Sequence, residues 1–375
     1  MRVLVCPDKF RGTLSARAAA LAIDAGWRRL RPGDRIDVVP LADGGEGTLD
    51  ALVAAAGGRT RTARVRGPLG DPVDASFGLI ETTGGRTGVV ELARASGLDL
   101  LAPSRRDALR ATTWGTGELM LAACREGAGE VLVSVGGSAT VDGGAGIAQA
   151  LGIGLLDARE RPIGPGGAGL LQLARIDLTA IDPGVRSARF VVATDVENPL
   201  TGPEGAARVF ASQKGASAQD ILVLERALGH LAAIVHRDLG LDVRSLPGGG
   251  AAGGVGAGLA AFLGAHLRPG AEMVMEAVGL RRRLASADVV VTGEGSFDAQ
   301  TMHGKVVARV LAAARELGVP AAVLCGRAEI DRQDVLIASL VDRFGPGPAV
   351  DEPRRRLEDL AAEVAAMADR LSSPG

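Results

Sequence analysis

The chain has 375 residues, of which 47% are hydrophobic and 23% charged, so a large core is possible and wholesale disorder is excluded. Its formal net charge is −2 and aromatic residues make up only 2% of it, which argues against a nucleic-acid-binding protein. At about 100–200 residues per domain, this length corresponds to two or three domains.

Cysteine and histidine patterns exclude several further classes. The three cysteines are far apart, which fits neither a disulfide framework nor a zinc knuckle, and the four histidines lack metal-binding spacing. The first residues lack the apolar run of a secretory signal. The longest uncharged apolar stretch, 248–265, is too rich in glycine for a lipid-facing helix. We therefore expect a soluble cytoplasmic protein without nucleic-acid or membrane partners; the sequence does not indicate its oligomeric state.

Short apolar β-branched runs alternate with longer helical patterns, which is typical of βαβ units and a parallel sheet. The predicted strands are Val3–Cys6, Ile36–Pro40, Val131–Val135, Phe190–Ala193, Val289–Thr292 and Ala321–Leu324. The predicted helices are Ala16–Leu30, Glu118–Glu126, Ala145–Leu151, Gln219–Leu239, Lys305–Leu317 and Leu357–Leu371. Shorter strands of a mixed or antiparallel sheet are predicted at Thr62–Val65, Val73–Leu79 and Thr87–Val90.

The two ends of the chain differ in character from its middle. Both ends have the pattern of a doubly wound α/β sheet, whereas residues 76–286 are richer in glycine loops and mixed elements. We therefore predict two α/β domains. The first is a discontinuous, Rossmann-like parallel domain of residues 1–75 and 287–375, and the second is a mixed α/β domain of residues 76–286 inserted into it.

Carboxylates follow five of the predicted strands, with glycine beside most of them. These residues are Asp8, Asp43 with Glu46, Asp142, Asp195, and Glu294 with Asp298. Ligands of open parallel sheets bind at the carboxyl ends of the strands, and glycine-rich turns that enter helices offer N–H groups to phosphate. Carboxylates and phosphates repel each other unless a cation such as Mg²⁺ lies between them. The pattern therefore favours a nucleoside triphosphate with magnesium, together with an acceptor.

Each of these motifs has a simpler interpretation when it is taken alone. An Asp-Gly-Gly sequence is most often a turn, and the glycines at 248–254 can serve merely as a tight helix entrance. Gly304-Lys305 is not a Walker A motif, because Val306 follows it, and no Gly-x-Gly-x-x-Gly follows the first strand. His303 fits a surface position as well as a phosphate site.

Lysine is rare in this chain. Of 42 basic residues only Lys9, Lys214 and Lys305 are lysines, and Asn198 is the only asparagine. All four lie in the glycine- and acid-rich segments. The lysines are therefore candidates for positions where the planar guanidinium of arginine cannot replace a compact ammonium.

Seven segments resemble the type I glycerate kinase family, in family order and over nearly the whole chain. They are residues 8–16, 40–48, 136–146, 195–203, 213–216, 247–269 and 292–301, and His303-Gly304-Lys305 follows the last. Two departures are Val141, where the family usually has asparagine, and Glu197, where it usually has aspartate. The resemblance implies ATP-dependent phosphorylation of D-glycerate, a magnesium requirement, and two α/β domains with the active site in the cleft between them.

Phosphoryl transfer depends on positioning and charge neutralisation, which suggests roles for individual residues. The glycerate hydroxyl needs a carboxylate base, for which Asp195 is the first candidate and Asp8 the second. Lys9 and Lys214 are the candidates for neutralising the transferred phosphoryl group.

Three further groups of residues complete the predicted site. The candidates for substrate binding are Arg11, Asn198, Arg327, Ser138 and Thr140, with an arginine on the substrate carboxylate. The candidates for metal binding are Asp43, Glu46, Asp142, Glu294 and Asp298. The candidates for nucleotide or phosphate binding are Gly136, Gly137, Gly249, Gly250, Gly253, Gly293, Gly295, His303 and Lys305.

Other functions stay open at this point. The resemblance favours 2-phosphoglycerate as the product, with 3-phosphoglycerate as the alternative. A hydroxy-acid oxidoreductase would share the α/β layout but would need the missing dinucleotide fingerprint. A non-catalytic sugar-acid sensor would keep the pocket without needing the metal-binding acids, yet all of these acids are in place.

Overall fold

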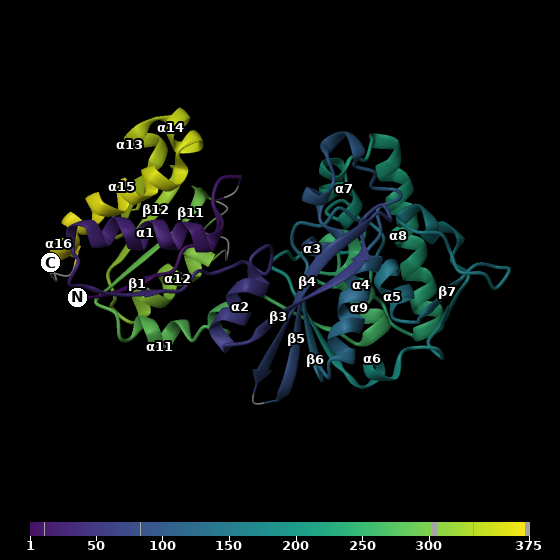
Figure 1. The fold of residues 1–375 in the computed structure, drawn as a ribbon. Coiled ribbons are helices and arrows are strands. Elements are labelled where there is room, and N and C mark those ends of the chain that lie inside the picture. Colours follow the sequence, from purple (N-terminus) through teal and green to yellow (C-terminus); the bar gives the residue numbers. More distant parts are fainter. Residues whose placement is uncertain (11, 83, 300, 302–305, 333, 372–375) are drawn as a thin grey trace. The chain divides into compact units, whose positions relative to one another are not determined.

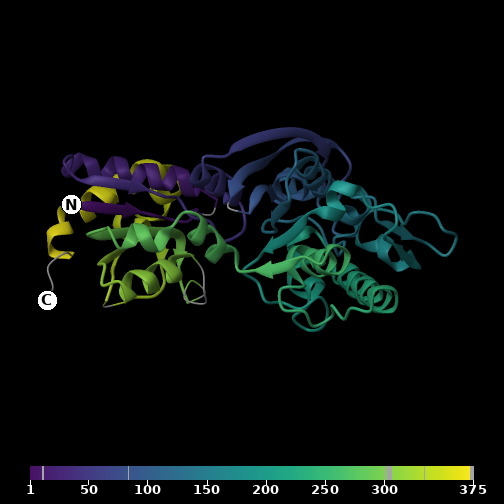
Figure 2. The same ribbon diagram turned by 90° about the horizontal axis from the view of Figure 1, so that it is seen from below.

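The computed structural model describes the chain except residues 11, 83, 300, 302–305, 333 and 372–375. It divides into two compact units (Figure 1). Unit 1 comprises Met1–Asp43 and Ala271–Gly375, and unit 2 comprises Gly44–Gly270. Figure 2 shows that the purple N-terminal and yellow C-terminal segments lie in the same unit, although they are far apart in the sequence.

Unit 1 is built on a parallel sheet. Within the described residues the sheet has five strands in the order β13-β12-β11-β1-β2, and every pairing is parallel. The strands are β1 (Arg2–Val5), β2 (Arg35–Val38), β11 (Val289–Phe297), β12 (Ala321–Ala328) and β13 (Leu336–Ser339). The helices are α1 (Ala16–Leu30), α10 (Gly270–Ala277), α11 (Leu280–Leu284), α12 (Val306–Glu316), α13 (Leu340–Phe344), α14 (Pro346–Asp351), α15 (Pro353–Ala366) and α16 (Ala368–Leu371).

Helices cover both faces of this sheet (Figure 1). Helices α1 and α15 pack together on one face over Val3, Val5, Val289 and Val291, while α12 packs on the other face over Phe297 and Val323. A parallel sheet covered on both sides needs strands that are apolar throughout, which is what the run Val289–Val291 provides. The predicted doubly wound α/β fold is confirmed.

Unit 2 is built on a mixed sheet. Its described residues form a six-stranded sheet in the order β10-β9-β6-β5-β4-β3 and a separate antiparallel pair, β7-β8. The strands are β3 (Arg59–Arg66), β4 (Pro72–Thr82), β5 (Gly85–Glu91), β6 (Glu130–Ser134), β7 (Gly154–Leu156), β8 (Arg175–Asp177), β9 (Arg189–Ala193) and β10 (His266–Arg268). Strands β5, β6, β9 and β10 run parallel, and β3 and β4 are antiparallel additions at one edge. The predicted mixed sheet is confirmed.

Several helices surround the sheets of unit 2. The α-helices are α2 (Thr48–Ala56), α3 (Ala93–Ser96), α4 (Trp114–Arg125), α5 (Ala145–Ala150), α6 (Pro183–Ser187), α7 (Ala206–Phe210), α8 (Ala218–Leu239) and α9 (Ala251–Leu263). The 3₁₀ turns are η1 (Leu98–Leu100), η2 (Pro103–Arg105), η3 (Gly167–Gln172) and η4 (Ser212–Lys214). None of the helices in the described part of the chain is both long and apolar enough to cross a bilayer.

The boundaries between the units differ from those predicted at 75/76 and 286/287. Strand β3 pairs with β4, where Arg59 lies opposite Leu79, and β4 pairs with β5, where Phe77 lies opposite Val90. Helix α2 packs on β4 and β5. The segment 44–75 therefore belongs to the mixed unit. At the other boundary, α11 packs against α12, so the segment 271–286 belongs to the parallel unit. Strand pairing over a long hairpin is not visible in composition, on which the prediction rested.

One predicted strand is longer than expected. The strand predicted at Val289–Thr292 continues through Glu294 to Phe297, because Ser296 and Phe297 pair with Arg327 and Ala328 of β12. Phe297 is fully buried and anchors this extension. Glu294 therefore lies within β11 rather than in a loop after it.

Helix α1 begins and packs as its sequence predicts. The Ser15 side chain caps it by accepting a hydrogen bond from the Ala18 N–H at 3.2 Å. Gly26 lies on its buried face, where a β-carbon would overlap the backbone carbonyl of Glu358 in α15. The close approach of these two helices therefore requires glycine at this position.

The packing of α1 against α15 generates a stability prediction. Gly26→Ala is expected to destabilise the protein by about 1–3 kcal/mol, because the added methyl group forces α15 away from α1. Gly33→Ala is the matched control, since a β-carbon there meets open space. Calorimetric melting of both variants tests this; equal melting temperatures would show that the helices separate without cost.

Candidate active site

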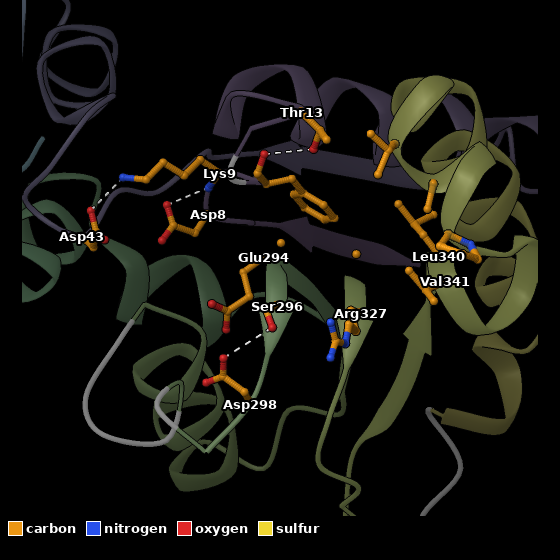
Figure 3. A pocket seen from close by; sticks show the side chains of 16 residues that line it. Asp8, Lys9, Thr13, Asp43, Glu294, Ser296, Asp298, Arg327, Leu340 and Val341 are labelled. Atoms are coloured by element: carbon orange, nitrogen blue, oxygen red, sulfur yellow. Dashed lines mark hydrogen bonds and ion pairs between the residues drawn. The ribbon is translucent and has the colours of Figure 1, made fainter. Parts of the chain in front are cut away.

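A pocket of about 600 Å³ lies in unit 1 (Figure 3). It is lined by Asp8, Lys9, Phe10, Thr13, Asp43, Glu294, Gly295, Ser296, Asp298, Gly326, Arg327, Leu340, Val341, Pro346, Ala349 and Val350. Six of these residues were predicted from the sequence as catalytic, substrate-binding or metal-binding groups. The pocket therefore brings together acids and cations from both ends of the chain, from Asp8 to Arg327.

Sheet topology explains why three of the carboxylates meet. Strands β2, β1 and β11 are adjacent and parallel, so the segments that follow β1 and β2 emerge at the same edge. The Asp8 N–H donates to the Gly293 carbonyl at 2.8 Å, and the Leu41 N–H donates to the Pro7 carbonyl at 2.9 Å. These two bonds continue the ladder beyond the strands and fix Asp8 between Asp43 and Glu294.

The Asp8 carboxyl has an unusual acidity. It is only 7% exposed, and burial, reinforced by the nearby Asp43 charge, raises its pKa to about 7. Two contacts at Lys9 oppose this shift: the Lys9 ammonium lies nearby, and the Lys9 backbone N–H donates to Asp8 Oδ1 at 2.7 Å. At neutral pH this carboxyl therefore exchanges readily between its protonated and charged forms.

The lysine beside Asp8 is held toward the acidic group. Lys9 Nζ forms an ion pair with Asp43 Oδ1 at 3.1 Å, and both side chains are largely buried (Figure 3). Such a partly buried pair places a point charge at a defined position, which a phosphate oxygen recognises. The Lys9 ammonium thus lies at the acidic edge of the pocket; its predicted role toward the transferred phosphoryl group stays a prediction.

Asp298 and Arg327 also line the pocket (Figure 3). Asp298 shapes a turn: its Oδ1 accepts from the Thr301 N–H at 3.1 Å, and its Oδ2 accepts from the Ser296 hydroxyl at 3.4 Å. Arg327 is mostly exposed and pairs with Glu329 at 2.9 Å. Both side chains reach the pocket from the extended ends of β11 and β12.

Unit 2 contains the predicted lysine Lys214, which is buried to 2% exposure. Its Nζ donates to Ser138 Oγ and to the Thr140 carbonyl oxygen, both at 2.8 Å. Burial lowers the pKa of Lys214 to about 7, although the charge of Asp142 opposes this. Lys214 therefore braces the glycine-rich loop 136–146 from behind, through two residues predicted to bind substrate.

Asp142, predicted as a metal ligand, is fully buried in unit 2. Its carboxylate accepts from the Thr113 N–H at 2.8 Å, the Thr113 hydroxyl at 2.9 Å, and the Gly144 and Gly146 N–H groups at 3.2 Å. Burial raises its pKa despite these bonds. This carboxylate satisfies the N–H groups at the start of α5, which leaves it no direct path to a metal ion in solvent.

The other two predicted acids of unit 2, Asp195 and Glu46, are exposed. Asn198 donates from Nδ2 to the Glu204 carbonyl at 2.9 Å and so closes the turn after β9.

The sequence analysis missed Glu91, which is buried at the end of β5. Its Oε2 accepts the N–H groups of Gly47 and Leu49 at 3.2 and 3.3 Å. Glu91 thus satisfies two N–H groups at the start of α2. The signal for it in the sequence was an acid at the end of an apolar strand.

The predicted phosphate-binding glycines have different surroundings. Gly253 has a φ of 71°, and a β-carbon at this position would overlap the Thr140 carbonyl. A β-carbon at Gly250 would overlap the Pro199 carbonyl. Gly249 is packed similarly against Leu246, and Gly136 packs against the backbone of Gly45, while Gly137 adopts a φ of 72°.

The two glycines of the 292–301 segment lie inside a strand. Gly293 and Gly295 belong to β11, and a β-carbon on Gly293 would overlap the Leu324 carbonyl of β12. Close backbone packing accounts for Gly136, Gly249, Gly250, Gly253 and Gly293. Arg11, His303 and Lys305 lie outside the described residues.

The acids of the unit 1 pocket are candidates for holding Mg²⁺. Among the residues that the structure describes, no group of three or more His, Cys, Asp or Glu side chains is placed to hold one. The carboxylate oxygens of Asp43 and Glu294 nevertheless suit Mg²⁺, which is commonly bound by one or two carboxylates with substrate phosphates and water completing its shell. The donor chemistry therefore fits a magnesium ion that arrives with a phosphate ligand.

A pocket at the carboxyl edge of a doubly wound parallel sheet, with a carboxyl that titrates near neutrality, is typical of α/β enzymes that bind small polar substrates. The sequence profile described as "Glycerate kinase family" matches residues 3–373. The chain belongs to the glycerate kinase family and is thus a kinase.

Individual relatives agree with this assignment. The chain is 46% identical to a glycerate kinase of Halalkalibacterium halodurans, over 86% of this chain and 85% of that one. It is 45% identical to a glycerate 2-kinase of Escherichia coli, over 87% of this chain and 85% of that one. A crystal structure assigned as glycerate kinase 2 from Salmonella typhimurium LT2 superposes with a TM-score of 0.84 at 42% identity, covering 99% and 98% of the two chains.

The buried Lys214 generates a prediction about stability and pH. Lys214→Met is expected to destabilise the protein by about 1–3 kcal/mol, because Ser138 Oγ and the Thr140 carbonyl lose their buried donor. The pKa of this lysine is lower in the folded than in the unfolded protein, so protonation below pH 10.5 favours unfolding. The wild type should therefore gain stability relative to Lys214→Met as the pH rises from 7 to about 10.

Melting temperatures of wild type and variant at pH 7 and pH 9.5 test this prediction. Arg226→Met, on the exposed part of α8, is the control, because arginine does not titrate in this range. A stability difference that stays constant between the two pH values would mean that Lys214 is not a strained buried charge.

Proposed function

We propose that this protein transfers the γ-phosphoryl group of ATP to the C2 hydroxyl of D-glycerate, giving 2-phosphoglycerate. Membership of the glycerate kinase family and the relative named glycerate 2-kinase support this proposal. The observation at the site that carries it is the Asp8–Lys9–Asp43 group in the unit 1 pocket. There the Lys9 ammonium pairs with Asp43, next to the Asp8 carboxyl, whose pKa is raised to about 7. Transfer to the C3 hydroxyl is the alternative; the oxidoreductase and sensor readings are not favoured.

Asp8 is our first candidate for the group that accepts the hydroxyl proton. A general base works best when its pKa lies near the working pH, and burial places the pKa of Asp8 at about 7. Asp195, which the sequence ranked first, is exposed and does not line the unit 1 pocket. We therefore reverse the order of the two candidates.

Roles in charge neutralisation, metal binding and positioning are assigned to four further residues. Lys9 neutralises charge on the transferred phosphoryl oxygens, since its ammonium is fixed beside the acidic edge by Asp43. Asp43 and Glu294 are the candidates for holding Mg²⁺, which would neutralise the charge of the phosphates when bound. Within unit 2, Lys214 acts as a positioning residue through Ser138 and Thr140. The expected cytoplasmic location stays a prediction.

The proposed activity gives a direct test. The purified protein should consume ATP in the presence of D-glycerate and Mg²⁺, and the product should be converted further by enolase, which accepts 2-phosphoglycerate. Excess EDTA should stop turnover. A product that enolase uses only after a mutase is added would place the phosphate on C3, and undiminished turnover in EDTA would refute the magnesium requirement.

The choice of base gives a second test, by Asp8→Asn. It should lower kcat by about a hundredfold or more, the lower end of general-base contributions. In the wild type, kcat/KM should rise as the pH passes about 7, where Asp8 loses its proton, and the variant should lack this rise. Asp195→Asn is the matched comparison and should retain most of its activity. The reverse pattern, a normal Asp8→Asn and an inactive Asp195→Asn, would return the role to Asp195.

Stability measurements separate a role for Asp8 in chemistry from one in folding. Because its pKa is raised on folding, the folded state binds this proton more tightly, and stability falls as the pH rises from about 4 to 7. Asp8→Asn removes this loss, so above pH 7 the variant should melt no lower than the wild type. A variant that melts well below the wild type at pH 8 would make Asp8 a structural residue.

A further inference from the structure

The unit 1 pocket has two sides of opposite chemistry (Figure 3). Asp8, Lys9 and Asp43 lie on one side and offer charged groups. The other side is a wall made by α13 and α14, and the residues of these helices that line the pocket are all apolar. This wall consists of Leu340, Val341, Pro346, Ala349 and Val350. The proposed chemistry of phosphoryl transfer uses the first side and leaves the wall without a function.

The wall contains an apolar side chain that the fold itself does not need. Leu340 is 1% exposed and packs into the core of unit 1, so it anchors α13 to the sheet. Val350, one turn from Pro346 in α14, is instead 63% exposed although it lines the pocket. A single exposed valine is ordinary, but here it continues the apolar surface formed by Ala349 and Pro346 inside a cavity.

Size and chemistry distinguish the two substrates of the proposed reaction. A volume of about 600 Å³ falls in the range of pockets that enclose ligands far larger than a three-carbon acid. Every carbon of glycerate carries oxygen, so an apolar wall offers it nothing. A purine ring presents a flat apolar face and gains from being removed from water against aliphatic side chains.

We propose that the α13–α14 wall binds the adenosine part of ATP, with its phosphates directed toward Lys9 at the charged side. This inference rests on the proposed function for the identity of the nucleotide. It assigns the apolar side of the pocket to the phosphoryl donor and makes Val350 a determinant of nucleotide affinity. Glycerate binding then does not depend on α14.

The test is Val350→Asp, which puts a carboxylate on the wall without disturbing the core. Leu30→Asp is the matched control, because Leu30 is 56% exposed in the same unit and does not line the pocket. Calorimetric titration with ADP and Mg²⁺ reports on the whole nucleotide without turnover. Titration with inorganic triphosphate and Mg²⁺ reports on the charged side alone. KM values for ATP and for D-glycerate complete the set.

Val350→Asp should raise the Kd for ADP by about tenfold or more, because the adenine ring would remove water from an unpaired carboxylate. Its Kd for inorganic triphosphate and its KM for D-glycerate should match the wild type, as should all values for Leu30→Asp. Unchanged ADP binding in Val350→Asp overturns the inference, and so does a rise in the KM for glycerate without one for ATP. The wild type could fail to phosphorylate glycerate while Val350→Asp still binds ADP more weakly than the wild type does. The proposed substrate would then be wrong, but the assignment of the α13–α14 wall to adenosine would hold.

Discussion

The parallel alignment of β2, β1 and β11 is the constraint on which the unit 1 site depends. It brings the chain after β1 and β2 to one edge of the sheet and holds Asp8 between Asp43 and Glu294. Burial, reinforced by the charges of Asp43 and Glu294, raises the pKa of Asp8. The ammonium of Lys9, which pairs with Asp43, opposes part of this rise in the pKa of Asp8. The proposed roles of Asp8 as proton acceptor and of Asp43 and Glu294 as cation ligands both depend on this arrangement.

Unit 2 uses buried charge for a different purpose. Glu91, Asp142 and Lys214 are each almost completely buried. Each forms hydrogen bonds with the backbone or side chains of neighbouring loops. A buried charge is stable only when such partners are present, so these three groups fix the loops they touch. The glycines of the same segments allow close backbone packing, as Gly253 does beside Thr140. Rigid loops are what a kinase needs to position a small acceptor.

Some features of this protein were predictable because they depend on neighbours in the sequence. The alternation of apolar runs and helical patterns indicated the doubly wound parallel sheet, and the long motif blocks indicated the glycerate kinase family. Helix α1 was predicted with its observed bounds because Ser15 caps it and its apolar period is regular. The gathering of Asp8, Lys9, Asp43, Glu294 and Asp298 at one edge followed from the rule that parallel strands share a carboxyl end.

The sequence by itself thus determined the fold class, the family and the residues that line the charged side of the pocket, since local periodicity and motif spacing encode these. Only the tertiary structure decided what each residue faces. Asp142 and Asp8 are both buried after strands and near glycines, but Asp142 accepts N–H groups of a turn, whereas Asp8 lines the unit 1 pocket. Pairing of β3 with β4 and of β4 with β5 placed residues 44–75 in unit 2, and pairing with β12 placed Glu294 within a strand. Burial and pairing arise from contacts between segments far apart in the chain, and no local pattern records them.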